Sequence, residues 1–334
     1  MVAGRVAIKD LKLNEIVTSY FLVRNPQLRL RKSGEAFLTL ILADRTGEIS
    51  AVMWDDLDGV GERIREGDLV KVQGVVGSYQ EEMQITIQRL RLAREGEVAL
   101  EDFLPATEAD VASMLAFLQE TIRSLTSEHL KHLLSGVFEE EAVLGAFAAA
   151  PAAKGLHHAY LGGLLEHTVS VVKLCEAIAS HYGPAVNRDL LLASAILHDV
   201  GKIFELTWER GFDYSDEGRL LGHITQGVLF VEEKIEQIPD FPAVLRMELL
   251  HNILSHHGEY EWGSPRRPKT LEALILHAME NLDGKVNLFQ KLAKHYPDPG
   301  RWGWTVFHRS VERPLFFGER QSPEGAVEVA REDG

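Results

Sequence analysis

The feature that most constrains the fold of this chain is a change in the spacing of its apolar residues near residue 100. Before that point, apolar and polar residues alternate over short runs such as Ala36–Asp44 and Met83–Leu90. From Glu108 onwards, apolar residues recur every three or four positions, the spacing of amphipathic helices. A chain of 334 residues can bury one core in each part. We therefore predict a β-domain followed by an all-helical domain.

The β-region is expected to contain about five short strands. The strand Ala36–Asp44 leads through a polar turn into a second strand that ends at Trp54, and a Gly-Asp pair precedes a third, Leu69–Val76. This order resembles the OB-fold, a small barrel found in single-strand-binding proteins. The resemblance implies that Phe37 and Trp54 offer stacking faces to unpaired bases. The alternative is that both belong to the core of the barrel, as most aromatic residues in small barrels do.

We place the domain boundary in a polar stretch that ends near Pro105. The predicted OB-fold domain covers residues 1–95, a linker covers 96–110, and the helical domain covers 111–320. The tail, 321–334, is rich in glycine and glutamate and is expected to be disordered. The chain is therefore predicted to be a multi-domain protein with separate α and β parts.

The charge and the apolar runs exclude several classes of protein. The formal net charge is −15, whereas residues 1–95 hold 14 basic and 14 acidic residues, so the acidic excess lies in the remainder. This argues against non-specific coating of nucleic acid. No apolar run is long enough to span a bilayer, and the first residues lack a secretory-signal pattern, so we expect a cytoplasmic protein. The single cysteine, Cys175, is expected to be a buried small hydrophobe rather than a catalytic thiol.

The doublet His198-Asp199, at the end of an apolar helix, is the first candidate for a metal site. An imidazole beside a carboxylate suits Mn²⁺, Fe²⁺, Co²⁺, Ni²⁺ or Zn²⁺, but such a pair alone is more often a solvated loop or a capped helix. The other histidines change this interpretation, because nine of the 14 lie between His157 and His257. Potential ligands follow one another with about one helix between members: His167, His198, Asp199, His223, His256, His257 and Asp283. A helical bundle can gather these side chains around two ions.

This order of ligands resembles that of the HD superfamily of metal-dependent phosphohydrolases, over roughly residues 155–292. The resemblance implies that four side chains hold the first ion: His167, His198, Asp199 and Asp283. It implies that the second ion is held by a bridging Asp199 and three imidazoles: His223, His256 and His257. Two such ions share a hydroxide that is nucleophilic at neutral pH, and they neutralise the phosphate under attack.

Neighbouring segments narrow the resemblance to one family. The segments Lys154–Thr168, His198–Lys202, Gly222–Ile224, Ser255–Gly258 and Gly263–Ala273 are similar to those of the YhaM-type 3′→5′ exoribonucleases. In that family an OB-fold precedes an HD domain. Membership implies manganese-favoured removal of nucleotides from the 3′ end of single-stranded RNA, with single-stranded DNA left open as a second substrate. The polarity of attack depends wholly on this resemblance.

Further residues are candidates for contacts with the substrate. His158 is assigned to the catalytic set as a proton donor to the leaving oxygen, and His157 as a phosphate contact; packing of the next helix is the alternative for both. Lys202 is a candidate for stabilising charge in the transition state, against a solvated helix end. Glu166 and Glu280 adjoin predicted ligands and could orient imidazoles or be structural carboxylates. A basic loop that binds phosphate or is simply solvated contains Arg266, Arg267 and Lys269.

Three functions are compatible with these residues. The leading one is hydrolysis of single-stranded RNA with two divalent ions, of which manganese is expected and iron, cobalt, nickel and zinc are alternatives. The first alternative is hydrolysis of a small nucleotide such as a cyclic dinucleotide, but Gly258–Pro265 lacks the Gly-Tyr-Pro element of such enzymes. The second is an OB-fold binding protein with an inert HD domain, which the intact ligand set disfavours. The oligomeric state, including a homo-oligomer, and the role of residues 302–317 are left open.

Overall fold

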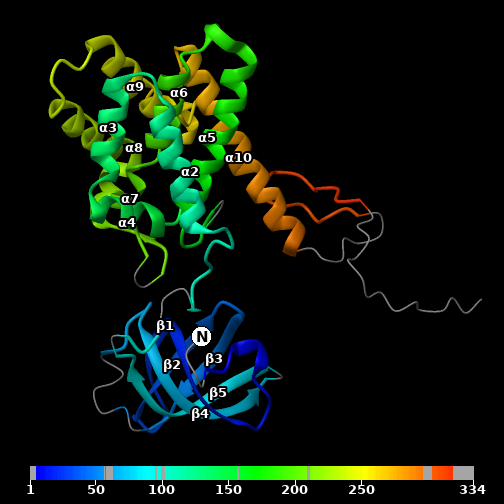
Figure 1. The fold of residues 1–334 in the computed structure, drawn as a ribbon. Coiled ribbons are helices and arrows are strands. Elements are labelled where there is room, and N and C mark those ends of the chain that lie inside the picture. Colours follow the sequence, from blue (N-terminus) through cyan, green and yellow to red (C-terminus); the bar gives the residue numbers. More distant parts are fainter. Residues whose placement is uncertain are drawn as a thin grey trace, which may run out of the picture. The chain divides into compact units, whose positions relative to one another are not determined.

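The fold combines a β-barrel with a helical bundle, as predicted (Figure 1). By its contacts the chain forms two compact units, Met1–Asp283 and Gly284–Gly334, and the first contains both the barrel and most of the helices. His157 and the predicted disordered tail, 321–334, lie outside the described residues. The computed structural model describes residues 5–55, 57, 63–80, 82–94, 96–98, 102–155, 158–208, 211–295 and 303–318.

Five strands close the barrel in the order β1-β2-β3-β5-β4. They are β1 (Ile16–Leu30), β2 (Ala36–Asp44), β3 (Gly47–Met53), β4 (Leu69–Tyr79) and β5 (Glu82–Leu92). Strands β3 and β5 pair in parallel, and the other four neighbouring pairs are antiparallel. Because side chains alternate along a strand, Phe21, Val72 and Ile85 fill the interior while their neighbours face outwards. The barrel is the predicted OB-fold.

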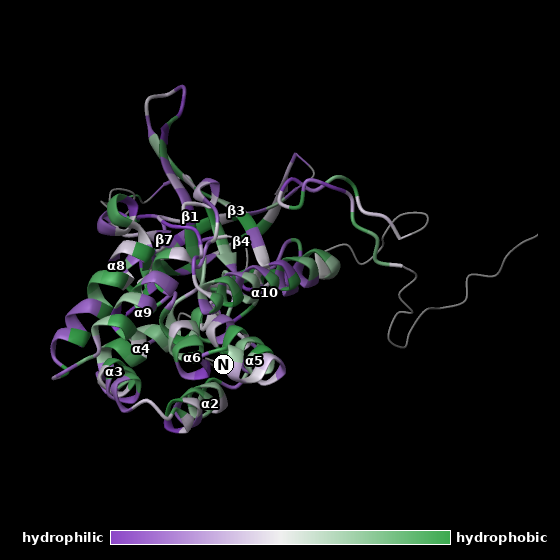
Figure 2. Ribbon diagram, turned by 90° about the horizontal axis from the view of Figure 1, so that it is seen from above, coloured by the Kyte–Doolittle hydropathy of each residue, from purple (hydrophilic) through white to green (hydrophobic). Residues whose placement is uncertain are grey.

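The helical part forms from segments with one apolar side. Apolar and polar stretches alternate along several of these helices in Figure 2, as expected where one side is buried. The short helix α7 leads into a two-stranded sheet of β6 (Leu206–Thr207) and β7 (Asp213–Tyr214). The helices are α2 (Val111–Ser124), α3 (Glu128–Phe138), α4 (Glu141–Ala149), α5 (Gly163–Tyr182), α6 (Arg188–Leu197), α7 (Lys202–Glu205), α8 (Asp216–Glu236), α9 (Ala243–Ser255) and α10 (Leu271–His295).

Helix α6 is the central helix of the bundle. Every residue from Asp189 to Leu197 is buried, which is the pattern of a helix packed on all sides. Asn187 is its N-cap, because its side chain accepts a hydrogen bond from the backbone N–H of Leu190. The helix ends at Leu197, so the His198-Asp199 doublet emerges inside the core.

Gly201, two residues after the His198-Asp199 doublet, does not end a helix. Its φ of −62° is helical, and it directly precedes α7. A glycine is required at this position because α8 packs closely against it. A Cβ on Gly201 would lie 2.0 Å from the carbonyl oxygen of His223 and 2.6 Å from the nitrogen of Gly227. Helix α8 is interrupted at Gly222, with φ 71° and ψ 156°, and continues at His223 as predicted. These two glycines allow α8 to approach the end of α6.

Other expectations concern packing and membrane spans. Cys175 is fully buried, and burial raises the pKa of its thiol to about 12, which confirms a packing role. Within the stretch expected to be a linker, Phe103 and Leu104 are buried, and the N–H of Thr107 donates to the carbonyl of Leu161. Among the described residues, no helix combines the length and the apolar character needed to cross a membrane.

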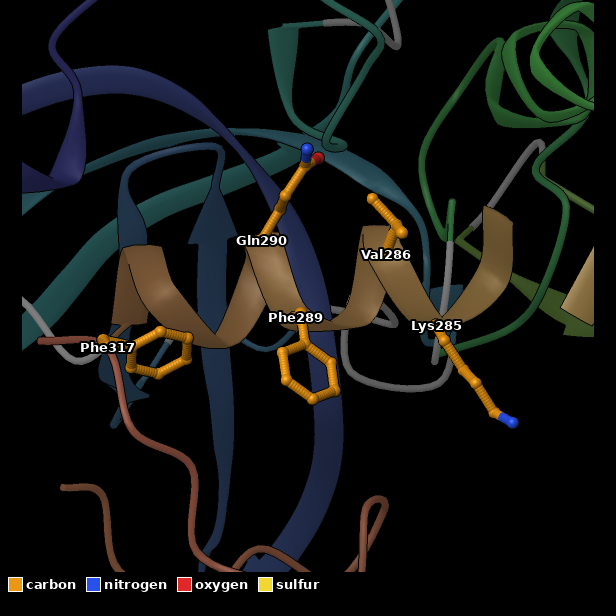
Figure 3. Close-up of a pocket in the computed structure, with 5 residues that line it drawn as sticks. All are labelled: Lys285, Val286, Phe289, Gln290 and Phe317. Atoms are coloured by element: carbon orange, nitrogen blue, oxygen red, sulfur yellow. The ribbon is translucent and has the colours of Figure 1, made fainter. Parts of the chain in front are cut away.

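The second unit contains the end of α10 and the segment 303–318. The N–H of Thr305 donates to the carbonyl of Leu315 and that of Phe317 donates to Gly303, so the segment folds back on itself. A mainly apolar pocket of about 420 Å³ is lined by Lys285, Val286, Phe289, Gln290 and Phe317 (Figure 3). None of these side chains is a common ligand of a transition metal, so this pocket is not the predicted site.

Candidate metal centre

Four imidazoles surround the carboxylate of Asp199, two residues beyond the end of α6. The Nε2 atoms of His167 and His198 lie 3.5 and 3.4 Å from Asp199 Oδ2. The Nε2 atoms of His223 and His256 each lie 3.5 Å from Asp199 Oδ1. Each carboxylate oxygen therefore faces its own pair of imidazoles. A carboxylate placed in this way can bridge two ions a few ångströms apart.

Backbone carbonyls fix the tautomer of two of these imidazoles and of His257. The Nδ1 atoms of His198, His256 and His257 lie 2.8, 2.7 and 3.0 Å from the carbonyl oxygens of Ala195, Ile253 and Trp262. Because a carbonyl only accepts hydrogen bonds, each Nδ1 must carry the proton. Each Nε2 then has a free lone pair, the form in which imidazole binds a metal. His257 completes a group with His223 and His256 whose ligand atoms lie within 4.8 Å of one another.

His223 is oriented by a carboxylate that the sequence analysis did not single out. Glu205, at the end of α7, accepts hydrogen bonds from the backbone N–H and from Nδ1 of His223, both at 3.0 Å. Burial opposes ionisation of Glu205, but the bonds from His223 hold its pKa below the usual value. This is the carboxylate–histidine pairing that positions metal ligands. Its only signal in the sequence is a glutamate shortly after the His-Asp doublet.

Unpaired buried atoms at this cluster fit a divalent cation. Among the described residues, Asp199 Oδ1, His223 Nε2 and His256 Nε2 are buried and have no hydrogen-bond partner. All three face one another, as the 3.5 Å distances show. An unsatisfied buried polar atom is costly, and three in one place need an explanation. A metal ion satisfies an oxygen and two nitrogen lone pairs together, so the residues fit the predicted ion.

The protonation states of the cluster also suit a metal. Burial lowers the pKa of His167 and of His256 to about 4, and that of His257 to about 2. Burial opposes the charge of Asp199 too, but Lys202 and His198 hold its pKa well below the usual range. At neutral pH Asp199 is therefore ionised and the imidazoles of His167, His256 and His257 are neutral, which is the state that metal binding requires of a ligand. Burial opposes protonation of His198, but the charge of Asp199 raises the pKa of its imidazole.

Asp283 and His158 lie on the side of His167 that faces away from Asp199. Asp283 Oδ2 lies 2.7 Å from Nδ1 of His167 and 2.9 Å from Nε2 of His158. The other nitrogen of His158 lies 2.7 Å from the hydroxyl of Tyr160, and Ser170 donates to Asp283 Oδ1. In this geometry Asp283 orients His167, whose Nε2 faces Asp199. Asp283 as a direct ligand stays a prediction, and the sequence analysis did not anticipate the partners Tyr160 and Ser170.

The remaining predicted residues are placed as follows. The ammonium of Lys202 lies 2.6 Å from Asp199 Oδ2 and is buried, so it is not a solvated helix end. Glu166 accepts a hydrogen bond from Thr107, a structural contact between the start of α5 and the stretch before α2. Burial, and then the charge of Asp199, raises the pKa of Glu280 to about 7. His277, which had no assigned role, has its Nδ1 2.8 Å from the carbonyl oxygen of the predicted ligand His256.

The basic loop after α9 is exposed. Arg267 forms an ion pair with Glu259 at 2.8 Å, and its guanidinium lies 5.0 Å from the centre of the Tyr260 ring. The backbone N–H of Lys269 donates to Nε2 of His251, and the side chains of Lys269 and Arg266 are exposed. Contacts of this loop with a substrate stay a prediction.

On the barrel, the two predicted aromatic residues pack against each other. The rings of Phe37 and Trp54 are stacked, with centroids 4.9 Å apart, and Trp54 is 41% exposed. The guanidinium of Arg31 lies 5.0 Å from the Trp54 ring and forms ion pairs with Glu35 and Asp55. These aromatic residues are therefore at the surface rather than in the barrel core.

Comparisons with known proteins agree with both parts of the fold. The family model of the HD domain matches residues 164–285, and that of the OB-fold nucleic acid binding domain matches residues 22–93. Two relatives bear the name 3′-5′ exoribonuclease YhaM, one from Geobacillus sp. (strain WCH70) and one from Bacillus velezensis. Each is 35% identical over 316 residues, which cover 92% of this chain and 95% or 99% of the relative.

Solved structures similar to part of this chain include an OB-fold domain and a single-stranded DNA binding protein. One is the second OB-fold domain of replication protein A from Methanococcus maripaludis, 23% identical, with a TM-score of 0.23 over 28% of this chain and 97% of that one. The other is the single-stranded DNA binding protein from Thermus aquaticus, 24% identical, with a TM-score of 0.23 over 26% of this chain and 43% of that one.

Proposed function

The chain belongs to the YhaM family of 3′-5′ exoribonucleases, and from this premise we propose that it removes nucleotides from the 3′ end of single-stranded RNA by metal-dependent hydrolysis. The observation that carries the proposal is the Asp199 carboxylate between two pairs of imidazoles. We propose two ions, with manganese as the natural metal. We also propose a cytoplasmic location, which suits an RNA substrate.

The proposed ligands divide between the two oxygens of Asp199. His167 and His198 with Asp199, joined by Asp283, would hold one ion; His223, His256 and His257 with the same carboxylate would hold the other. When bound, the ions supply an activated hydroxide and neutralise charge on the phosphate. The protein keeps the ligands ready, because carbonyls and carboxylates on the outer ring nitrogens aim each imidazole at Asp199.

Two residues are proposed to act on charge and protons. Lys202 keeps Asp199 ionised through its contact of 2.6 Å and adds positive charge beside the cluster. His158 is proposed as the proton donor to the leaving oxygen, and Asp283 Oδ2, 2.9 Å from its Nε2, orients the imidazole. Phosphate contacts from Arg266, Arg267 and Lys269 complete the proposal, and their exposure leaves them accessible to a long substrate.

Labelled oligoribonucleotides test this function. With manganese present, a 5′ label should remain on a ladder of products that shorten from the 3′ end, and a 3′ label should be released in the first step. Hydrolysis of a cyclic dinucleotide alone would overturn the exonuclease in favour of a small-nucleotide phosphodiesterase. Less than one bound metal per chain after manganese loading, together with no phosphodiesterase activity, would leave only a binding protein.

A further inference from the structure

The outer face of the barrel carries a groove over strands β1, β4 and β5 that is lined by polar and apolar side chains. Its volume is about 580 Å³. The strand pairing places its outward-facing side chains in two rows across the sheet. In the first row Thr18 is opposite Gln73, which is opposite Arg89; in the second, Lys71 is opposite Arg91. The groove is therefore built from three strands and held by the register of the barrel.

A β-bulge shapes the middle of this groove. The pairing of β4 with β5 shifts between Gln73 and Gly74, which leaves Gln88 as an extra residue beside Arg89. The strands approach closely at this point, since a Cβ on Gly74 would lie 2.5 Å from the carbonyl oxygen of Thr86. Bulges of this kind turn side chains in new directions and are common beside binding sites.

The groove also concentrates positive charge in a barrel segment that is neutral as a whole. Arg91 is neutralised by two hydrogen bonds of 2.8 Å to Glu97. The ammonium of Lys71 lies 5.0 Å from the Tyr20 ring, and Arg89 is exposed. Within the described part of the chain, neither Lys71 nor Arg89 forms an ion pair. Two cations are therefore free for an anion, with the amide of Gln73 between them.

The Phe37–Trp54 surface differs in this respect. One face of each ring is already used in their mutual stacking, and Arg31 packs on Trp54. Arg31 is also paired with the two carboxylates of Glu35 and Asp55, at 3.4 and 3.1 Å. The cation that packs on Trp54 is therefore already neutralised, whereas Lys71 and Arg89 in the groove form no ion pair among the described residues.

We propose that this groove binds the phosphodiester backbone of single-stranded nucleic acid through Lys71 and Arg89, with amide contacts from Gln73 and Gln88. Diagonal neighbours on a sheet face lie about 7–8 Å apart, so the two cations can contact different phosphates. Amides donate to phosphate oxygens and also reach sugar hydroxyls and base edges, which suits a nucleotide better than an acidic protein segment. The inference rests on the proposed function in that the substrate is a nucleic acid.

Binding of a fluorescein-labelled oligouridylate to the full-length protein tests the groove. Anisotropy is measured in EDTA, which prevents cleavage, at several salt concentrations. For Lys71→Ala/Arg89→Ala we expect an affinity loss of about tenfold or more. We also expect the slope of log affinity against log salt concentration to become less steep by about 1.4. Each phosphate contact on a single strand contributes about 0.7 to this slope. Arg89→Lys should retain most of the affinity, because it keeps the charge.

A matched control and a small substrate separate the possible outcomes. Arg45→Ala removes an exposed arginine in the turn between β2 and β3, and should change the affinity by less than about twofold. Hydrolysis of bis(p-nitrophenyl) phosphate, which is too small to reach both sites, should be equal in all variants and shows that they are folded. If the double variant binds oligouridylate like the wild type, the groove proposal is overturned. The proposed function is overturned separately, if the wild type with manganese does not hydrolyse RNA. Poly-glutamate is the probe for an acidic protein segment. If Lys71→Ala/Arg89→Ala loses binding to poly-glutamate but keeps its affinity for oligouridylate, the proposal is also rejected.

Discussion

The barrel and the helical bundle differ in where their charged side chains lie. The barrel carries them on its outer surface, whereas the bundle buries several of them in its core. The interior of the barrel is filled by apolar side chains such as Phe21 and Val72, which leaves no space for a ligand, so its charges lie outside. The bundle instead buries His167, His198 and Asp199 completely or almost completely. Helices that surround a central helix can supply a partner for each buried polar group. We therefore expect the chemistry to take place inside the helical bundle and the contact with a polymer to lie on the outside of the barrel.

The largest expected effect comes from the carboxylate at the centre of the bundle. Asp199→Asn should lower RNA hydrolysis by at least about a thousandfold, because loss of a mere orienting partner already costs about 10–100-fold. It should also reduce the metal content, measured by elemental analysis. Oligouridylate affinity in EDTA should remain close to that of the wild type, since the barrel is unchanged.

The control for this change lies ten residues earlier. Asp189→Asn alters a buried carboxylate of α6 that accepts hydrogen bonds from Thr126 and Ser127, away from the cluster. It should lower the free energy of unfolding by about 1–2 kcal/mol and leave the activity of the folded protein unchanged. Wild-type activity in Asp199→Asn would refute the bridging role.

A smaller effect is expected at the residue that orients His223. Glu205→Gln keeps the shape of the side chain but removes its charge, so activity should fall by about 10–100-fold and manganese should bind more weakly. A titration of activity against manganese concentration measures both. Glu166→Gln is the matched control, since this carboxylate contacts Thr107 and should leave both values unchanged. Equal behaviour of the two variants would remove Glu205 from the site.

The pH should affect the two regions differently. His167 and His256 have pKa values of about 4 in the folded protein, below the usual value of about 6.5. Between these values the unfolded chain binds more protons than the folded one, so the metal-free bundle should lose stability as the pH falls from 6.5 to 4. The barrel segment 1–95 contains no histidine and should be insensitive over this range. Hydrogen exchange, corrected for intrinsic rates, can compare peptides of α6 and β4; parallel loss of protection would contradict the expectation.

The smallest effect is expected on the aromatic surface of the barrel. Trp54→Leu should lower the affinity for oligouridylate by less than about threefold, because its ring already packs with Phe37 and Arg31. A fully formed base stack would instead contribute about 1–3 kcal/mol. Anisotropy under the conditions used for the groove variants measures the difference. A loss larger than that of Lys71→Ala/Arg89→Ala would move the main contact from the groove to this surface.

The sequence alone determined the two fold types and most of the histidine set. Alternation in Ala36–Asp44 and the three- to four-residue spacing after Glu108 are local patterns, and they fix which side of each element is buried. The candidate ligands could also be recognised from the sequence alone, because their residue types and spacing are features of the sequence. They are His167, His198, Asp199, His223, His256, His257 and Asp283.

Only the tertiary structure decided how these residues face one another. Glu205 belongs to the site because Gly201 lets α8 approach α7, and nothing near Glu205 in the sequence signals this contact. Asp283 contacts Nδ1 of His167, although the two residues are 116 positions apart in the sequence. Likewise, Lys71 and Arg89 share a groove only through the register of β4 and β5 and its bulge. Periodicity specifies the buried side of an element, whereas packing between distant elements sets which side chains meet.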